Sequence, residues 1–430
     1  MSNLTLIEQA LVEQNPHWKN KPYVLTFKRL HDLSVQADFG LDEIQIITGI
    51  RRSGKSTLLQ ALINHLTQKI SPLSILYINL DDPNFVDIYE DAKQLYQVIT
   101  IAEKISGQSI RYLFLDEIQN ILAWEQYVKS AYDSHRFKKI ALSGSNADLL
   151  NSDYASLLSG RYVKTQIYPL AYRELLLNHH ITDYQQLLQH KSEALRMIEK
   201  MLRLGGFPRI HCIDQVDQCR KLLQNYYETI LLKDCISNHN VRDTRTLMNL
   251  AHYQISHIGS LYSYNSLSKA IGSNENTLQN FLQIFQDAYF INEIKPYSRS
   301  LKSQLKGKKK VYCIDNGLVT STTFKFTDDI GRLFENLVYT ELEKSGKKNI
   351  CFDNNQKECD FIFHDEQGPI ALQVCYEINA ESREREIKGI KMAMNTHKIN
   401  RGMIITYDNE ERLTDNIQIY PFWKYFSGFE

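Results

Sequence analysis

The feature that most constrains the fold of this chain is an alternation of short apolar runs with amphipathic stretches between residues 43 and 168. The apolar runs are EIQIIT, ILYIN, YLFLD and KIALSGS, and each is followed by a stretch with helical periodicity. Apolar runs of this length between amphipathic helices are typical of parallel strands that are buried on both faces. The sequence therefore predicts an α/β domain built on a parallel sheet.

A glycine-rich motif, Gly-Ile-Arg-Arg-Ser-Gly-Lys-Ser at 49–56, directly follows the first apolar run and opens the first helical stretch. It matches GxxxxGK[ST], a loop whose backbone N–H groups surround phosphate oxygens at a helix start that adds partial positive charge. Lys55 would contact the β- and γ-phosphates, and Ser56 would ligate Mg²⁺. The alternative is a chance glycine-rich turn, which the flanking strand and helix disfavour. We expect an ATP-binding loop made of Gly49, Arg51, Arg52, Ser53, Gly54, Lys55, Ser56 and Thr57.

A pair of carboxylates, Asp116 and Glu117, ends the apolar run YLFLD. At the end of a neighbouring strand, Asp116 would hold the water shell of Mg²⁺ while Glu117 polarises the attacking water. Many strands end in acidic turns, so the pair alone is a weak signal. It indicates a metal and water site because a phosphate loop precedes it in the sequence. The adjacent glutamate also favours hydrolysis over phosphoryl transfer to a small molecule.

Polar residues also follow the next predicted strand, KIALSGS. Ser145 and Asn146 would face the ligand crevice of a parallel sheet and could sense the γ-phosphate. They could equally cap the helix that follows, and both roles could hold together. Arg161 precedes the run YVKTQIY and is a candidate arginine finger for a neighbouring subunit's nucleotide, with a solvated arginine as the alternative.

The composition limits the partners and the compartment. The 430 residues carry 50 Lys plus Arg and 50 Asp plus Glu, so a nucleic-acid contact would need a local basic patch. The N-terminus lacks the pattern of a signal peptide, and no apolar run approaches the ~20 residues of a membrane helix. The seven cysteines are scattered without a CxxC pair. We expect a cytoplasmic protein with free thiols and no membrane contact.

The stretch SYNSLSKAIGSNENTLQNFLQIFQDAYFI predicts a helix, a turn at Gly272 and a second helix, and INEIKPY and KKVYCID predict two strands around a basic loop. In a winged helix of this kind, the loop lysines would contact DNA phosphates while Asn276 and Gln279 would reach base edges. The alternative is a hairpin and helix pair that contact only protein. The candidate nucleic-acid residues are Asn276, Gln279, Lys302, Lys306, Lys308, Lys309 and Lys310.

Several segments, in order along the chain, resemble the archaeal-type AAA-like ATPases of bacteria and archaea. GIRRSGKSTLL is similar to the phosphate loop of that family, FLDEIQN to its metal strand, SGSNADLL to its sensor strand and LSGRY to its arginine signature. IYPLAYREL, GGFPRI, KVYCIDNGL, GRLFENLVYTEL and ECDFIF are similar to the blocks that follow. The resemblance implies an AAA-type core, a winged helix and a C-terminal fold related to PD-(D/E)xK nucleases. It also places Arg161 at the position of the family's trans-acting arginine.

We therefore expect an α/β protein with a parallel-sheet P-loop ATPase core, a helical lid and winged helix, and a C-terminal restriction-endonuclease-like domain. The expected boundaries are an N-terminal helical segment at 1–42, the core at 43–168, the lid at 169–258, the winged helix at 259–326 and the nuclease-like domain at 327–430.

The predicted C-terminal domain carries a degraded nuclease pattern. A PD-(D/E)xK nuclease needs a helix acid, an aspartate and an [E/Q]xK triplet, whose carboxylates hold Mg²⁺ and whose lysine stabilises charge on the phosphate. Glu335, Asp360 and Gln373 fit this pattern, but Cys375 stands at the lysine position. Lys388 or Lys391 could replace the lysine from the next helix. We expect an inactive pocket.

The predicted function is Mg²⁺-dependent ATP hydrolysis of the AAA type, coupled to conformation or assembly in a DNA-associated process. A homo-oligomer with shared nucleotide sites would fit this function. The first alternative is a nucleotide-gated switch that recognises a protein through the winged-helix and C-terminal domains. A less favoured alternative is an ATP-regulated nuclease.

Overall fold

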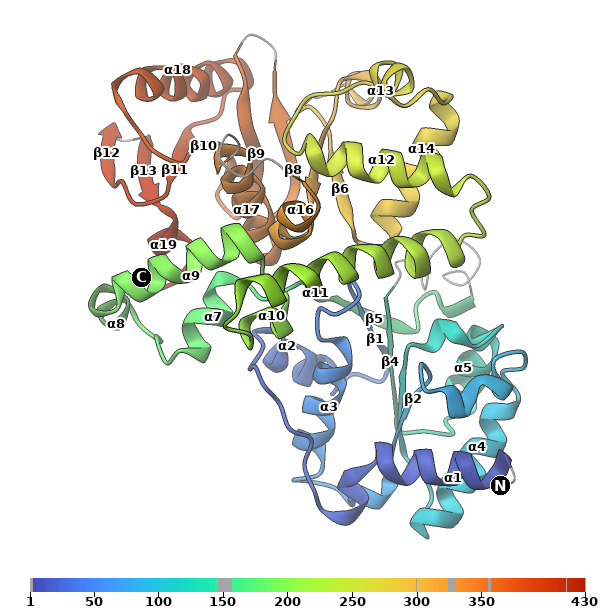
Figure 1. Ribbon diagram of the computed structural model, residues 1–430. Helices are drawn as coiled ribbons and strands as arrows, with labels where there is room; N and C mark the ends of the chain where they lie inside the picture. Colours follow the sequence, from blue (N-terminus) through green and yellow to red (C-terminus); the bar gives the residue numbers. More distant parts are fainter. Residues whose placement is uncertain are drawn as a thin grey trace. The chain divides into compact units, whose positions relative to one another are not determined.

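The computed structural model describes residues 3–145, 157–298, 300–323, 330–354, 357–414 and 416–429. The chain divides into two compact units, Met1–Ile167 and Tyr168–Glu430 (Figure 1). No helix in the described ranges is both long enough and apolar enough to cross a membrane.

The first unit is built on the predicted parallel sheet. Its five strands lie in the order β2-β3-β4-β1-β5, and every neighbouring pair is parallel. The strands are β1 (Ile44–Thr48), β2 (Ile75–Asn79), β3 (Tyr112–Asp116), β4 (Lys139–Gly144) and β5 (Tyr162–Gln166). Because β4 lies between β1 and β3, the segments that follow these three strands meet at one edge of the sheet. The prediction of an α/β core is confirmed.

Helices cover both faces of this sheet (Figure 1). Side chains of a strand alternate between faces, so Leu76 and Ile78 join one apolar cluster while Ile75 and Tyr77 join the other. The first cluster includes residues of α1 (Asn3–Gln14), α4 (Gln94–Ser106) and α5 (Trp124–Asp133). The second includes residues of α2 (His31–Asp38) and α3 (Lys55–Leu66).

The N-terminal segment completes the edge of the sheet at β2. The Asn15 side-chain amide donates to the Tyr77 carbonyl at 2.9 Å, and the Tyr77 N–H donates to Asn15 Oδ1 at 2.8 Å. The Asn79 N–H donates to Gln14 Oε1 at 2.8 Å, and Trp18 Nε1 donates to the Ile75 carbonyl at 2.8 Å. These side chains satisfy the backbone groups of an edge strand, which would otherwise be open to another chain.

The second unit begins with helices α7 (Tyr172–Asn178), α8 (Tyr184–Gln189), α9 (Lys191–Leu204), α10 (Pro208–His211) and α11 (Val216–Thr229), which continues as a π-helix over Ile230–Ser237. Between α9 and α10, Gly205 has a φ of 72°, and an added Cβ there would lie 1.6 Å from Asp315 Oδ1. The Gly206 N–H donates to Asp315 Oδ2 at 2.6 Å. Only glycine at 205 leaves room for this buried carboxylate to hold the turn.

The middle of the second unit contains α12 (Thr244–Ser256), α13 (Tyr264–Ile271), α14 (Glu275–Asp287) and the strands β6 (Ile291–Ile294) and β7 (Lys310–Cys313). Gly272 ends α13 with a φ of 77°, and the Asn274 side chain caps α14 by accepting from the Thr277 N–H. β6 and β7 pair antiparallel, so the two expected strands are present. The expected basic loop between them contains a helix that the sequence analysis missed, α15 (Leu301–Lys306).

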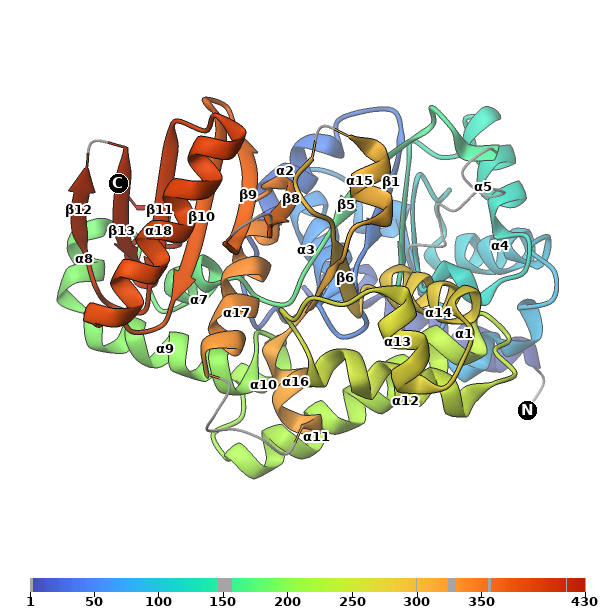
Figure 2. The same ribbon diagram turned by 90° about the horizontal axis from the view of Figure 1, so that it is seen from above.

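The C-terminal part contains α16 (Asn316–Thr322), α17 (Ile330–Lys344) and a mixed six-stranded sheet in the order β12-β13-β11-β10-β9-β8. Along β9, Phe361 contacts Tyr339 of α17, whereas Ile362 joins a cluster with Ile390 of α18, so the two helices cover opposite faces. Figure 2 shows α18 lying across the sheet. The remaining elements are β8 (Lys348–Asp353), β9 (Cys359–Asp365), β10 (Gly368–Cys375), α18 (Ala380–His397), β11 (Arg401–Thr406), β12 (Glu411–Thr414), β13 (Ile417–Pro421) and α19 (Phe422–Tyr425).

Candidate nucleotide site and associated clusters

The glycine-rich loop connects the end of β1 to the start of α3. Gly49 has a φ of 144°, and a Cβ there would lie 2.1 Å from the Ile167 carbonyl oxygen. Gly54 precedes α3 with a φ of 104°, and among the described residues no side chain caps the N-terminus of that helix. The first N–H groups of a helix lack partners within the helix. The uncapped start of α3 and the tight loop therefore fit a phosphate group.

Lys55 lies at the centre of the loop with an exposed fraction of 4%. Its ammonium donates to the carbonyls of Gly49 at 3.1 Å and Ile50 at 3.4 Å. It also lies 3.7 Å from Glu117 Oε1. The structure thus brings together the lysine of the loop and the second carboxylate after β3, which are far apart in the sequence.

Asp116 is fully buried at the end of β3 and is held by three hydroxyls. Tyr77 Oη donates to Asp116 Oδ2 at 2.7 Å, and Ser143 Oγ donates to Oδ1. The Ser56 hydroxyl is the third hydrogen-bond partner. Serine and carboxylate oxygens are ligands that Mg²⁺ accepts, directly or through water, so Ser56 and Asp116 together fit a magnesium ion.

The two carboxylates differ in their affinity for protons. Burial and the neighbouring charge of Glu117 raise the pKa of Asp116 above its ordinary value, although its hydroxyl partners oppose this shift. Burial alone would also raise the pKa of Glu117, but the charges of Lys55 and Arg51 outweigh burial and lower it. Glu117 is therefore ionised at neutral pH. A cation beside Asp116 would favour its ionised form as well.

Glu117 has a left-handed backbone with a φ of 55°, uncommon for a residue other than glycine. Its N–H donates to Ser143 Oγ at 3.3 Å, and its carboxylate accepts from Gln119 Nε2. The same Gln119 amide lies 3.5 Å from Ser145 Oγ. Ser145 is thus placed at the same edge of the sheet as Glu117, whereas Asn146 lies outside the described residues.

The remaining loop residues differ in exposure. Ser53 is buried, and its hydroxyl makes no hydrogen bond within the described part of the chain. Arg51 is half-buried, Arg52 is exposed with a φ of 71°, and Thr57 lies half-buried in the first turn of α3.

Arg161 lies immediately before β5 and is partly exposed. Its Nε donates to Asp133 Oδ1 of α5 at 2.9 Å. This ion pair lies at the surface of the first unit, where such pairs contribute little to stability and exchange readily. The role of Arg161 across subunits remains a prediction.

Two site residues escaped the sequence analysis. Arg29 is 8% exposed, and its Nη1 donates to the Ser53 carbonyl of the phosphate loop at 2.7 Å. It lies in a connector, FKRLHDL, where nothing distinguishes it from Lys28. Tyr77, which holds Asp116, reads in the sequence as one more apolar residue of a strand. Its position two residues before the end of β2, beside β3, was the available signal.

The lysines around α15 fall into two groups. Lys302, Lys306 and Lys308 are exposed, as expected of a basic surface. Lys309 and Lys310, expected among them, are 3% and 1% exposed. Lys309 donates to the carbonyls of Leu305 and Gly307, and Lys310 begins β7. Both side chains are thus buried and not exposed on the basic loop as expected. Their contact with DNA stays a prediction.

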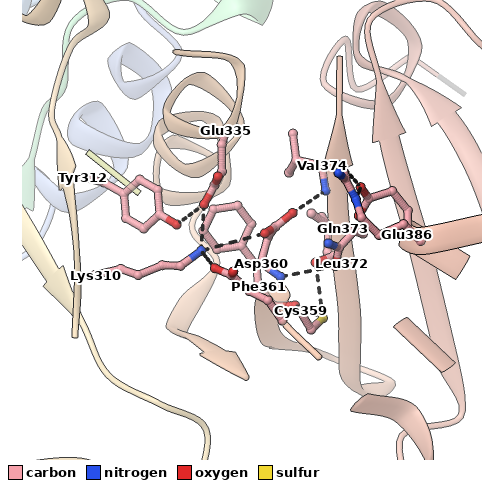
Figure 3. Close-up of polar contacts among 12 residues, drawn as sticks. Lys310, Tyr312, Glu335, Cys359, Asp360, Phe361, Leu372, Gln373, Val374 and Glu386 are labelled. Carbon is pink, nitrogen blue, oxygen red and sulfur yellow. Dashed lines mark hydrogen bonds and ion pairs between the residues drawn. The ribbon is translucent and has the colours of Figure 1, made fainter. Parts of the chain in front are cut away.

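The expected nuclease-like residues only partly gather. The Asp360 N–H donates to Gln373 Oε1 at 3.4 Å, and Glu335 and Asp360 share the ammonium of Lys310 (Figure 3). Cys375 instead belongs to the apolar cluster under α18, where its thiol donates to the Glu377 carbonyl. Lys388 and Lys391 are exposed on α18. The lysine of this pocket is thus Lys310, a residue that spacing had assigned to the basic loop.

Two stretches of the chain match known families. Residues 41–176 match a family described as "AAA domain", and residues 195–329 match "Domain of unknown function (DUF8612)". The first match covers the sheet, the phosphate loop and the carboxylate pair. The second begins within α9, covers the helices that follow and the β6–β7 hairpin, and stops before α17.

Whole-length relatives are also found. The uncharacterized protein MJ1544 of Methanocaldococcus jannaschii is 30% identical over 404 residues, covering 89% of this chain and 88% of its own length. An uncharacterized protein of Haemophilus influenzae is 30% identical over 352 residues, covering 80% of this chain and 85% of its own. The Aeropyrum pernix ORC1 protein, solved in complex with DNA, shares 11% identity with a TM-score of 0.30 over 74% of this chain and 91% of that one, which is too low to carry an inference.

The match to an AAA domain agrees with the geometry of the phosphate loop. This chain belongs to the same family as these relatives from Methanocaldococcus jannaschii and Haemophilus influenzae, and its residues 41–176 match an AAA domain.

Proposed function

We propose that the protein is a Mg²⁺-dependent ATP hydrolase of the AAA type that couples its nucleotide state to conformation or assembly. The observation that carries the proposal is the convergence of Lys55, Asp116 and Glu117 at one edge of the parallel sheet, with Lys55 Nζ 3.7 Å from Glu117 Oε1. A cation, a buried metal-ligating carboxylate and an ionised carboxylate next to a phosphate loop are the parts that hydrolysis of a phosphoanhydride needs.

Each group has a distinct task in this proposal. Lys55 and the N–H groups at the start of α3 bind the β- and γ-phosphates. Ser56 and Asp116 hold Mg²⁺, which when bound neutralises charge that develops on the phosphates. Glu117 orients the attacking water and accepts its proton, for which it must be ionised. Tyr77 and Ser143 fix the orientation of Asp116, and Arg29 supports the backbone of the loop at Ser53.

The test is the turnover of Lys55→Ala, with Lys104→Ala as a matched control at an exposed position. We expect the first variant to lose ATP binding or turnover, because it loses the one ammonium that the loop encloses, while the control keeps both. A folded Lys55→Ala protein that hydrolyses ATP at the parent rate would refute the proposal.

We further propose that α13, α14 and the β6–β7 hairpin form a winged helix that contacts DNA. Residues of α14 and of the hairpin line one groove of about 940 Å³, among them Gln279 and the exposed Lys295 and Lys306. Lys302, Lys306 and Lys308 would contact phosphates, and the exposed Asn276 and Gln279 would reach bases. ATP turnover with and without duplex DNA tests the link, and stimulation by DNA is expected.

A second candidate is a nucleotide-gated switch that recognises a protein through the same region. It is favoured by Leu301 and Leu305 of α15, which are 67% and 54% exposed beside the lysines. Exposed leucines on a short helix are more typical of a protein interface than of a DNA contact. Absence of DNA binding at low salt, together with slow release of bound nucleotide, would favour the switch.

For the C-terminal sheet we propose an inactive relative of the PD-(D/E)xK nucleases. Cys375 lies in the apolar cluster under α18, and the carboxylates that would hold a metal ion are ion-paired instead with Lys310. We expect no Mg²⁺- or Mn²⁺-dependent cleavage of single- or double-stranded DNA. Cleavage by the unaltered protein that disappears in Asp360→Ala would contradict this.

A further inference from the structure

A buried lysine lies among three carboxylates in the second unit. Lys310 Nζ lies 2.6 Å from Glu358 Oε1, 3.0 Å from Glu335 Oε1 and 3.8 Å from Asp360 Oδ1. The Lys310 side chain is 1% exposed. Figure 3 shows the lysine reaching from the β7 strand toward Glu335 on α17 and Asp360 on β9.

The carboxylates are held in place by groups other than the lysine. The buried Tyr312 hydroxyl donates to Glu335 Oε1, and the Val374 N–H donates to Asp360 Oδ2 at 2.8 Å (Figure 3). Glu358, by contrast, is 47% exposed. Two carboxylates of the pocket, those of Glu335 and Asp360, are therefore held by other groups of the fold, and the third belongs to an exposed side chain that can adjust.

The pocket holds more negative than positive charge. Burial alone would lower the pKa of Lys310, but Glu335, Asp360 and Glu358 outweigh burial and raise it. Three carboxylates lie within 3.8 Å of this one ammonium. One ammonium thus leaves part of the carboxylate charge uncompensated, which a divalent cation would neutralise more fully.

We propose that Lys310 is the resident cation of this pocket and occupies the place of a divalent metal ion. The carboxylate oxygens are ligands that Mg²⁺, Mn²⁺ and Ca²⁺ prefer, at about 2.0–2.6 Å from the metal. An ammonium already lies 2.6 and 3.0 Å from two of these oxygens, so the lysine and a metal ion exclude each other. In the described part of the chain, no group of three His, Cys, Asp or Glu side chains is arranged to hold a metal ion. This agrees with the pocket, where the carboxylate oxygens are arranged around the Lys310 ammonium.

Lys310 also connects two parts of the second unit. Lys310 belongs to β7 of the hairpin, whereas the carboxylates belong to α17 and the C-terminal sheet. The same ion pairs that exclude a metal therefore join the hairpin to the sheet. A buried ion pair of this kind is costly to break, because a carboxylate left without its partner stays buried.

The test uses the 430-residue, nucleotide-free protein and four variants. Lys310→Met removes the positive charge and keeps the length of the side chain, and Lys310→Arg keeps the charge. Glu335→Gln removes one carboxylate, and the double variant Lys310→Met with Glu335→Gln removes both charges. Thermal unfolding is measured with and without Mn²⁺, and bound Mn²⁺ is counted by electron paramagnetic resonance. Comparing Lys310→Met with the double variant distinguishes Mn²⁺ bound in this pocket from any Mn²⁺ held near the phosphate loop.

We expect Lys310→Met to bind one more Mn²⁺ than the parent and to gain roughly 5 °C in melting temperature at a Mn²⁺ concentration 100 times the Kd. The parent, Lys310→Arg and the double variant should show neither change. If Lys310→Met unfolds without metal, Mn²⁺ should restore its folding.

Four outcomes overturn the proposal. The first is a Lys310→Met protein that folds but gains no Mn²⁺, and the second is one that stays unfolded with Mn²⁺ while Lys310→Arg folds. The third is a parent protein whose bound Mn²⁺ is lost in Glu335→Gln, because the pocket would then hold a metal together with the lysine. Metal-dependent DNA cleavage by the parent that requires Glu335 would have the same meaning.

Discussion

Replacing Glu117 by glutamine separates the two effects of its carboxylate on the phosphate loop. Glu117→Gln keeps the shape of the side chain but removes the base, so hydrolysis should slow by about 10²- to 10⁴-fold. The charge that lies 3.7 Å from Lys55 Nζ disappears at the same time. Lys55 then no longer shares its ammonium between a carboxylate and the phosphates, and ATP should bind more tightly.

The distance sets the size of the second effect. Two unit charges 3.7 Å apart attract by about 4.5 kcal/mol at an effective dielectric constant of 20. Only part of this energy is recovered on ATP binding, because Lys55 also donates to the Gly49 and Ile50 carbonyls. Recovery of about 1.4–2.8 kcal/mol corresponds to a ten- to hundredfold lower Kd for ATP.

The assay measures the Kd with a fluorescent ATP analogue in excess Mg²⁺ and the turnover by phosphate release, with the exposed Glu90→Gln as a control. We expect tighter binding and slower turnover in Glu117→Gln and neither change in the control. Parent-like turnover would show that another residue activates the water. An unchanged Kd would show that Lys55 and Glu117 do not compete with the nucleotide.

Arg161→Ala should keep the ATP affinity but lower turnover by roughly 10³-fold. If the arginine acts across subunits, mixing this variant with Lys55→Ala subunits should restore activity. A mixture that stays inactive counts against a shared site. Replacing Lys302, Lys306 and Lys308 by glutamine should weaken DNA binding equally for all sequences. The slope of log K against log salt concentration should fall by about 2–3, as measured by fluorescence anisotropy at several salt concentrations. Unchanged binding would favour a protein partner for these three lysines. Burial raises the pKa of Asp315 to about 6. The folded state therefore keeps a proton that the unfolded state releases between about pH 4 and 6, and stability falls across this window by roughly 3 kcal/mol as the pH rises. Denaturant unfolding of Asp315→Asn should lack this fall, and a pH-independent difference from the parent would contradict it.

The sequence was most informative where local pattern and chemistry coincide. The order of apolar runs and helices predicted the parallel sheet, because strands that are buried on both faces consist mainly of apolar residues. The phosphate loop and the pair Asp116–Glu117 were predicted to share one sheet edge, and the structure places Lys55 beside Glu117 and Ser56 beside Asp116. In each case the strand end fixes where the residue lies, so one-dimensional spacing suffices.

Prediction failed where a long side chain or an irregular segment decides the contact. Arg29 reaches the loop from a connector without periodic pattern, so no rule of spacing could select it. Lys309 and Lys310 belong to a run of three lysines that reads as a solvated tip, but β7 begins within the run and turns both ammonium groups inward. α15 was missed because six residues carry too little periodicity to distinguish a helix from a loop.

Two of the buried lysines, Lys55 and Lys310, differ in the partners that surround their ammonium groups. Lys55 has one carboxylate at 3.7 Å and two carbonyl oxygens, so a polyphosphate can outcompete its partners without leaving a bare charge in an apolar interior. Lys310 has three carboxylates and almost no exposure, so an incoming phosphate would meet net negative charge. Lys55 can therefore exchange its partners for a phosphate, whereas Lys310 stays paired with its carboxylates. We therefore expect phosphate chemistry in the first unit. In the second unit, we expect the carboxylate pocket to hold the β6–β7 hairpin on the C-terminal sheet through Lys310.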